Sequence, residues 1–185
     1  QALGFKEVFD DSATFPTGEW LEEFNRRLIR KPLGLHLGCN MRIANVDFNL
    51  LHNAGFRMLL FGIESANQIT LDKINKGVKY EDIIPTIRRA AAAGLECHGA
   101  FMFGYPWETE QDAERTLNLC HYLLRKGYLQ TAQASLYCPQ GVPGNQAHKK
   151  YVKKIYNAAY YPEFWFHKLR SIRCKEDIHY IWLGI

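Results

Sequence analysis

Residues 59–77 read LLFGIESANQITLDKINKG. The stretch opens with an apolar run typical of a buried β-strand, which ends in a glycine and is followed by Glu64 and Ser65. A short amphipathic segment then leads to Lys76. In parallel α/β folds, binding sites collect at the carboxyl ends of the strands. Polar residues at this position therefore predict a site at the strand end.

The same order of apolar run, turn and helical segment recurs along the chain. Nearly continuous apolar runs predict strands covered on both faces at residues 5–9, 33–37, 57–63, 97–104 and 132–138. Amphipathic segments predict helices at residues 18–30, 46–56, 80–94 and 109–127. Thr109 with Asp112 three residues later predicts a capping box at the last of these helices. Strands alternating with helices predict an α/β fold with parallel strands and right-handed crossovers.

The number of strand–helix units decides whether the predicted sheet can close into a complete barrel. Five units lie within residues 1–144, whereas a closed eight-stranded barrel takes about 250 residues. We therefore expect an open doubly wound sheet or a partial (β/α) barrel of about five parallel strands in residues 1–144. Residues 145–185 show helical spacing, a break at Pro162 and many aromatic residues. They predict a C-terminal helical extension.

Composition excludes some classes of protein. No apolar run approaches the roughly 18 residues of a membrane span. The five cysteines include no CxxC pair, so they suggest reduced thiols in a cytoplasmic protein. Residues 145–185 carry 8 basic and 3 acidic groups of a chain with net charge +4. A solvated helix face is favoured over a nucleic-acid surface for this basic tail. Because the first residue is Gln, we expect a piece of a longer protein.

The first two strand ends carry charged side chains. Asp10 and Asp11 follow the first run, where they could cap a turn or face a site. Arg42 follows the second run and could pair a carboxylate from a ligand or from a neighbouring strand end.

The third strand end carries the strongest signal. Gly62 allows close backbone approach, and the acceptor-only carboxylate of Glu64 suits a pair of ribose hydroxyls. Ser65 can donate or accept, and Lys76 would return a positive charge to the same edge. These residues predict a cradle for a zwitterionic or sugar-bearing ligand. An internal ion pair of Glu64 with Lys76 or Arg42 is the alternative.

The fourth and fifth strand ends are less polar. A left-handed turn at Gly104 would expose main-chain groups able to hydrogen-bond a flat heterocycle, although a plain βα turn explains the same residues. Tyr137 precedes a loop rich in proline and glycine, which we expect to lie over the mouth of the barrel.

Taken together, the strand ends resemble the radical S-adenosylmethionine (radical SAM) enzymes, and most closely the group that also carries a cobalamin-binding domain. The motifs are FDDSATF (9–15), FGIESANQITLDKINKG (61–77), FMFGYPWETEQD (101–112) and YCPQGVPGN (137–145). They are similar to the second, fourth, fifth and sixth strand motifs of that family. YNAAYYPEFWFHKLRS (156–171) resembles its aromatic-rich final helices. The resemblance implies strands two to six of a radical SAM barrel.

The resemblance also implies roles for individual residues. Glu64, with Ser65, would contact the ribose of S-adenosylmethionine, and Lys76 would meet the methionine carboxylate. Asp10 and Asp11 would face the cavity, and Arg42 and Tyr137 would lie at its rim. The residues expected along the adenine are Met102, Phe103 and Gly104.

One family feature is missing from the sequence. The CxxxCxxC loop that holds a 4Fe–4S cluster does not occur, and the resemblance places its ligands before Gln1. We therefore expect a fragment of an enzyme that reductively cleaves S-adenosylmethionine to a 5′-deoxyadenosyl radical, as a cobalamin-dependent methyltransferase or an oxidoreductase. Cobalamin would bind upstream. The parent would need a small-molecule substrate and an electron donor, and the fragment alone would be inactive. Its exposed strand edges predict self-association.

Three other interpretations remain. The chain could be a barrel that lost the cluster and kept a nucleoside-binding or scaffold role. It could be a different βα-barrel enzyme whose carboxylates share a cation, although their separation around the rim argues against this. It could be a nucleic-acid-binding module using the basic tail, but no recognised motif accompanies that tail.

Overall fold

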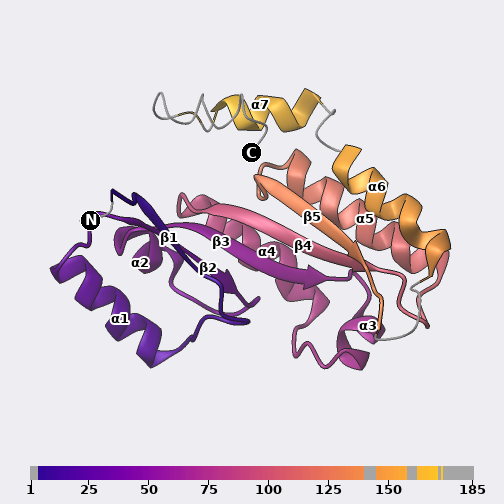
Figure 1. Ribbon diagram of the computed structural model, residues 1–185, viewed down its shortest axis with the longest axis horizontal. Helices are drawn as coiled ribbons and strands as arrows, with labels where there is room; N and C mark the ends of the chain where they lie inside the picture. Colours follow the sequence, from indigo (N-terminus) through magenta and orange to yellow (C-terminus); the bar gives the residue numbers. More distant parts are fainter. Residues whose placement is uncertain (1–3, 140–144, 158–161, 171, 173–185) are drawn as a thin grey trace.

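The computed structural model describes residues 4–139, 145–157, 162–170 and 172 (Figure 1). Its strands are β1 (Glu7–Asp10), β2 (His36–Met41), β3 (Phe56–Glu64), β4 (Glu96–Phe103) and β5 (Thr131–Leu136). The helices of the crossovers are α1 (Glu19–Arg30), α2 (Phe48–Asn53), α3 (Gln68–Lys73), α4 (Tyr80–Ala92) and α5 (Glu110–Arg125). After β5 come a 3₁₀ turn (Gln146–His148), α6 (Lys149–Tyr156) and α7 (Pro162–Arg170).

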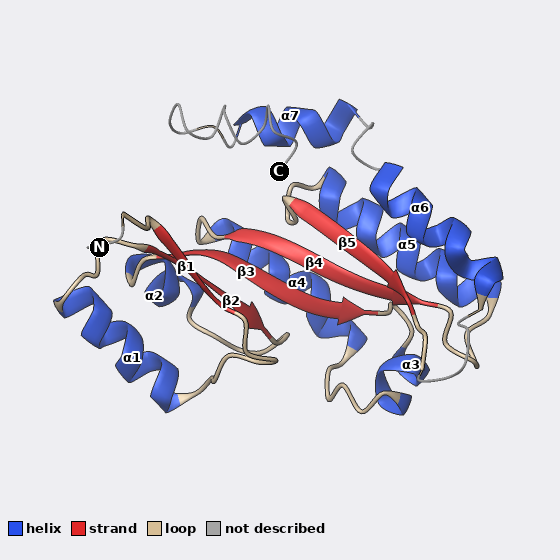
Figure 2. Ribbon diagram, in the orientation of Figure 1, coloured by secondary structure: helices blue, strands red, loops and turns tan. Residues whose placement is uncertain are grey.

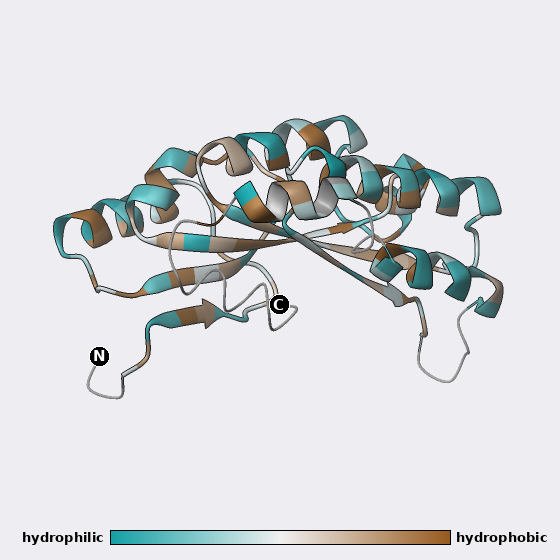
Figure 3. Ribbon diagram, turned by 90° about the horizontal axis from the view of Figure 1, so that it is seen from above, coloured by the Kyte–Doolittle hydropathy of each residue, from teal (hydrophilic) through white to brown (hydrophobic). Residues whose placement is uncertain are grey.

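All strand pairs are parallel, and the spatial order β1-β2-β3-β4-β5 follows the chain (Figure 2). A doubly wound sheet reverses its strand order at a switch point, whereas sequential order is that of a barrel wall. Figure 3 shows the long crossover helices together on one side of the sheet. The prediction of a partial (β/α) barrel is therefore confirmed, and the doubly wound alternative is not adopted.

The strand register gives the sheet two different faces. Cys39, Leu59 and Cys97 lie side by side on β2, β3 and β4 and are buried against the helices. The next row, which includes Leu60 and His98, faces the other way and is only partly buried. Side chains of successive residues alternate between the two faces. The helix-covered face holds the apolar core, and the opposite face is the inner wall of the partial barrel.

The second strand lies further along the chain than predicted. Apolar residues at 33–37 suggested the strand, but β2 spans His36–Met41, and Leu33 is exposed. Cys39 and Met41 face the helices and are almost completely buried. Because cysteine and methionine act as apolar core residues here, a pattern based on Leu alone begins the strand too early.

The helix boundaries follow the capping signals. The capping box at α5 is confirmed: the Thr109 side chain accepts from Asp112 N, and the Asp112 carboxylate accepts from Thr109 N. Asp47 and Asn67 are the N-caps of α2 and α3. The side chain of each accepts from a main-chain N–H of the first turn. These caps fix where the helices start, and so fix the strand-to-helix turns at the carboxyl edge of the sheet.

Helices α6 and α7 follow the last strand. Tyr151 and Ile155 of α6 are buried, and the Tyr156 hydroxyl donates to the main-chain oxygen of Ala134 on β5. The division of the chain at residue 144 into barrel and extension stays a prediction, and residues 140–144 and Cys174 lie outside the described residues. Within the part of the chain that is described, no helix is both long and apolar enough to cross a bilayer.

Candidate functional site

Glu64 and Lys76 form an ion pair at the carboxyl end of β3. Lys76 Nζ lies 2.9 Å from Glu64 Oε1, and the two side chains are 24% and 21% exposed. The pair lies directly over Gly62, because a Cβ there would be 2.7 Å from Lys76 Nζ and 3.0 Å from Glu64 Oε1. The structure thus brings together three predicted features, and of the two ion pairs considered from the sequence it forms the one with Lys76.

The backbone at Glu64 is unusual for a residue with a side chain. Its φ angle is 64°, in the left-handed region that few non-glycine residues adopt. The pairing of β3 with β4 shifts register between Gly62 and Glu64, so the strand carries a bulge at its end. Bulges re-aim side chains and are frequent beside active sites. The conformation at Glu64 therefore marks this strand end as a candidate site.

Arg42 braces the segment that carries Lys76. One of its terminal nitrogens donates to the main-chain oxygen of Lys76 at 2.5 Å. Arg42 is exposed, and its hydrogen-bond partner within the described residues is this main-chain oxygen rather than a carboxylate from a neighbouring strand end. It links the end of β2 to the loop that follows α3.

Asp10 and Asp11 are both exposed at the end of β1. Asp10 accepts hydrogen bonds from the hydroxyl and the N–H of Ser12, which lower the pKa of its carboxyl. Asp11 accepts from the Asn40 side chain at 3.3 Å. Asn40 also donates to the main-chain oxygen of Ser12 at 2.8 Å. These contacts order the β1 turn against the end of β2 while the aspartates stay accessible.

Ser65 is completely buried beneath this edge. Its hydroxyl accepts from Asn67 N at 3.1 Å and lies 3.4 Å from Thr116 Oγ1 on α5. Asn67 in turn donates to Asp112, the acidic residue of the capping box. In this structure Ser65 orders the turn after β3 and ties it to α5, and so supports the position of Glu64.

The last two residues of β4, Met102 and Phe103, lie in different environments. Met102 is partly buried on the inner face, whereas the Phe103 ring packs in the core and stacks on Tyr151 at 5.9 Å between centroids. The Phe103 oxygen accepts from Tyr137 N at 2.7 Å. The pairing of β4 with β3 ends at Phe101. Along a strand, the main-chain N–H and C=O groups of successive residues point alternately to the strand on one side and to the strand on the other. The main-chain groups of Met102 therefore face the side from which β3 has diverged.

Gly104 makes the sharp turn expected of it, with φ of 85°. Its N–H donates to Glu108 Oε2 at 2.5 Å, and the same oxygen lies 2.9 Å from His148 Nδ1. Both Glu108 and His148 are buried. Burial raises the pKa of the Glu108 carboxyl, and the hydrogen bonds from Gly104 and His148 oppose that rise. This network ties the turn after β4 to the segment before α6.

An aromatic wall was missed from the sequence. Tyr105 lies between Trp107 and Tyr137, with ring centroids 5.4 Å and 4.8 Å away. Burial raises the pKa of Tyr105, and the nearby charge of Glu64 adds to the rise. Trp107 Nε1 donates to Thr70 on α3, which lies beside these strand ends (Figure 1). The GYPW segment contains these rings, but only their three-dimensional stacking shows that they form one wall beside Glu64.

The described cysteines do not form a cluster site. Cys39 and Cys97 are buried, and burial raises the pKa of each thiol to about 12, which opposes the thiolate that iron ligation requires. Cys120 is buried and Cys138 is exposed. Among the described residues, no group of three or more His, Cys, Asp or Glu is arranged to hold a metal ion. These residues do not fit a 4Fe–4S cluster.

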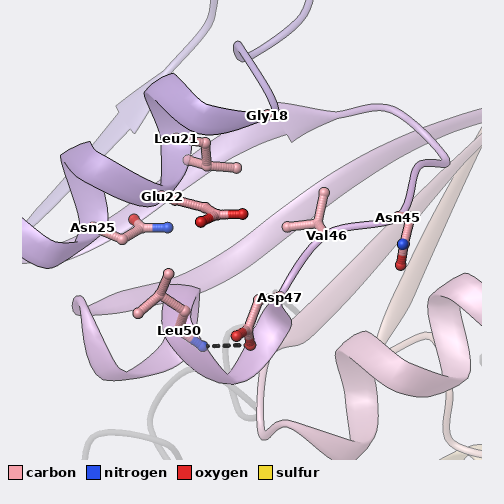
Figure 4. A pocket seen from close by; sticks show the side chains of 8 residues that line it. All are labelled: Gly18, Leu21, Glu22, Asn25, Asn45, Val46, Asp47 and Leu50. Carbon is pink, nitrogen blue, oxygen red and sulfur yellow. Dashed lines mark hydrogen bonds between the residues drawn. The ribbon is translucent and has the colours of Figure 1, made fainter.

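A small pocket lies apart from this edge, between α1 and the start of α2 (Figure 4). Its volume is about 40 Å³, enough for an ordered water, and its lining includes Leu21, Glu22, Asn25 and Asp47. Asp47 is already occupied in capping α2. None of the predicted site residues lines this pocket. The candidate site is therefore the edge formed by Glu64, Lys76 and the aromatic wall.

Comparisons with known proteins match most of the described strands and helices to one family. The family model described as "Radical SAM superfamily" matches residues 8–120. The chain is 33% identical over 125 residues to an uncharacterized methyltransferase, PH0819, of Pyrococcus horikoshii, covering 65% of this chain and 27% of that protein. It is 29% identical over 122 residues to the anaerobic magnesium-protoporphyrin IX monomethyl ester cyclase of Rubrivivax gelatinosus, covering 63% and 22%. The chain thus spans about a quarter of the length of these relatives.

A solved structure shows the same fold. The radical S-adenosylmethionine methyltransferase TsrM from Kitasatospora setae, with cobalamin and a [4Fe-4S] cluster bound, matches with a TM-score of 0.62. The match covers 73% of this chain and 28% of that chain at 19% sequence identity. At this identity the likeness concerns the fold alone.

Proposed function

Because the chain belongs to the Radical SAM superfamily, we propose that it is part of an enzyme that binds S-adenosylmethionine at the carboxyl edge of this sheet. The observation that carries the proposal is the Glu64–Lys76 pair, which is more than three quarters buried over Gly62 at a strained strand end. S-adenosylmethionine supplies a sulfonium whose reductive cleavage gives a 5′-deoxyadenosyl radical able to abstract hydrogen from a substrate. The residues of this chain bind and orient it.

The donors and acceptors at this edge match the parts of that molecule. The Glu64 carboxylate accepts from two ribose hydroxyls, and Lys76 donates to the methionine carboxylate. The main-chain groups of Met102 offer hydrogen bonds to the adenine edge, and Gly104 lets the backbone turn close to the ring. Ser65 holds the turn beneath Glu64, and Phe103 anchors the end of β4 through its buried ring.

Residues around the rim complete the proposed site. Tyr137 and Tyr105 form a wall beside the nucleoside, and Arg42 fixes the loop that carries Lys76. The exposed carboxylates of Asp10 and Asp11 are available to a small-molecule substrate on the β1 side.

The rest of the enzyme lies outside the residues described here. We propose that another segment of the parent protein holds the 4Fe–4S cluster, that an electron donor reduces it, and that this chain alone is inactive. A methyltransferase reaction with cobalamin bound upstream is proposed from PH0819 and TsrM, and an oxidoreductase reaction is the second type considered. Reduced thiols favour a cytoplasmic setting. Self-association through the edges of β1 and β5 is tested by sedimentation velocity at increasing concentration.

A barrel that kept the nucleoside site and lost the cluster would contain the same edge. The coding sequence upstream of Gln1 distinguishes the two: an in-frame CxxxCxxC motif supports the enzyme, and its replacement supports the scaffold role.

The proposed ribose contact is tested with Glu64→Gln. Removing a hydrogen-bonded charge costs about 1.5–3 kcal/mol, so affinity for S-adenosylhomocysteine, measured by calorimetry, should fall about tenfold or more. Glu81→Gln, which neutralises an exposed carboxylate on α4, is the matched control and should bind like the wild type. Equal affinity of the Glu64→Gln variant and the wild type would refute the assignment.

A further inference from the structure

We propose that Lys76 is an exchangeable counter-ion, which pairs with Glu64 in the empty site and moves to the carboxylate of an incoming ligand. The site would then favour nucleosides that carry a carboxylate and release those that do not. This inference rests on the proposed function and adds a basis for ligand selection and product release to it.

The Glu64–Lys76 ion pair is built into this strand end. Lys76 Nζ lies 2.9 Å from Glu64 Oε1, and both side chains are more than three quarters buried. The ammonium fills the space over Gly62, because a Cβ there would be 2.7 Å from Nζ. A partly buried charge pair is screened less by dissolved salt than an exposed pair. The wild-type site is thus occupied by its own cation before a nucleoside arrives.

A ribose competes with this cation for the same acceptor. An ionised carboxylate offers two oxygens and donates nothing, so two ribose hydroxyls use both oxygens of Glu64. Lys76 already donates to Oε1. A nucleoside without a negative charge must share Oε1 with the ammonium of Lys76 and offers Lys76 no anion in return. A nucleoside with a carboxylate gives Lys76 a new partner while its ribose takes Glu64.

The backbone allows Lys76 to swing while its loop stays fixed. Its N–H donates to the Leu71 oxygen at 2.9 Å, and its own oxygen accepts from Arg42 at 2.5 Å. Asn75 and Gly77 on either side both have φ in the left-handed region, which fixes the path of the loop. The flexible four-carbon side chain of Lys76 can therefore change partner by rotation about its own bonds.

The same exchange would act on the products. Reductive cleavage of the bond between sulfur and the 5′ carbon separates methionine, which keeps the carboxylate, from the deoxyadenosyl portion. When methionine departs, Lys76 loses its second anion and returns to Glu64. It then competes with the ribose of the remaining nucleoside and favours its release.

The test compares adenosine with S-adenosylhomocysteine, binding each to wild type and to Lys76→Met by calorimetry at pH 8. Adenosine should bind the variant about two- to fivefold more tightly, since a partly exposed ion pair contributes up to about 1 kcal/mol. S-adenosylhomocysteine should bind it at least about fivefold more weakly. Lys79→Met removes an exposed lysine three residues away and should change neither affinity. Lys76→Arg, which keeps the positive charge, should restore the relative affinities of the two ligands seen in the wild type.

The outcomes separate the two proposals. Opposite shifts for the two nucleosides support the exchange. Equal or parallel shifts overturn it while leaving the nucleoside site in place. If neither nucleoside binds to folded wild-type protein, the proposed function fails and the exchange fails with it. Circular dichroism of each variant establishes that a lost affinity does not come from unfolding.

Discussion

Gly62 shows how one missing side chain permits the proposed site. The ammonium of Lys76 and the carboxylate of Glu64 occupy the space that a Cβ at residue 62 would take. The sequence contained each of these residues, and it predicted either a ligand cradle or an internal ion pair. The structure shows the ion pair, and the two interpretations become successive states of one site in the exchange proposed above.

Gly62→Ala should weaken ligand binding while leaving the stability of the fold almost unchanged. The atoms nearest to its Cβ are at the ends of two flexible side chains, so the free energy of unfolding should change by less than about 1 kcal/mol. Affinity for S-adenosylhomocysteine should fall several-fold because Glu64 and Lys76 are displaced. Urea unfolding and calorimetry measure the two effects.

Gly99→Ala on β4 is the contrasting variant. Its Cβ would be 2.7 Å from Leu129 Cδ1 and 3.2 Å from Ile63 Cδ1, within the core. It should therefore cost about 1–3 kcal/mol of stability. If Gly62→Ala destabilised the protein as much as Gly99→Ala and left binding unchanged, the proposed position of the site over Gly62 would be wrong.

Other site residues could not be assigned from the sequence because their roles depend on neighbours far along the chain. Ser65 was expected at the ribose, yet its hydroxyl meets Asn67 N and lies near Thr116 on α5. Tyr105 and Trp107 stood within a quoted motif, but only the structure shows that Tyr105 contacts Tyr137, the residue after β5, as well as Trp107.

At the scale of elements, the turn between β4 and α5 depends on a buried carboxyl. Glu108 Oε2 accepts from Gly104 N, while Oε1 is buried without a hydrogen-bond partner within the described part of the chain. Burial raises the pKa of Glu108 above its usual 4.5, and the hydrogen bonds from Gly104 and His148 only partly offset this. The folded protein therefore retains this proton to a higher pH than the unfolded chain does.

This difference predicts a dependence of stability on pH. The contribution of Glu108 is fully present below its unfolded pKa and is lost as pH rises through the raised folded pKa. Glu108→Gln cannot titrate, so the free energy of unfolding of the wild type, relative to this variant, should fall as the pH rises above 4.5. Urea unfolding of both proteins at increasing pH measures it. A difference that stays constant or grows with pH would contradict the assignment.

Signals between residues close in sequence predicted where a helix begins better than they predicted contacts between distant parts of the chain. Thr109 and Asp112 identified the start of α5 correctly because a capping box involves only neighbours in sequence. The start of β2 was misplaced because the burial of Cys39 and Met41 depends on helices packed against the sheet. The partnership of Glu108 with His148, 40 residues later, had no local signal at all.

At the scale of the whole molecule, the five parallel strands in sequential order form part of a barrel wall. Alternating strands and helices predicted the α/β class, but two sheet architectures remained open until the strand order was seen. The long crossover helices lie together on one side of the sheet (Figure 3). Because the strands are parallel, Asp10, Arg42, Glu64 and Gly104 lie at or just after the carboxyl ends of four strands, at one edge of the sheet. This shared edge is what makes a single nucleoside site possible.

The most direct test is a crystal structure of this chain with S-adenosylhomocysteine. The account predicts the ribose hydroxyls within hydrogen-bond distance of both Glu64 oxygens, with Lys76 Nζ moved from Glu64 to the ligand carboxylate. A nucleoside bound away from β3, or bound with the Glu64–Lys76 pair intact, would contradict it.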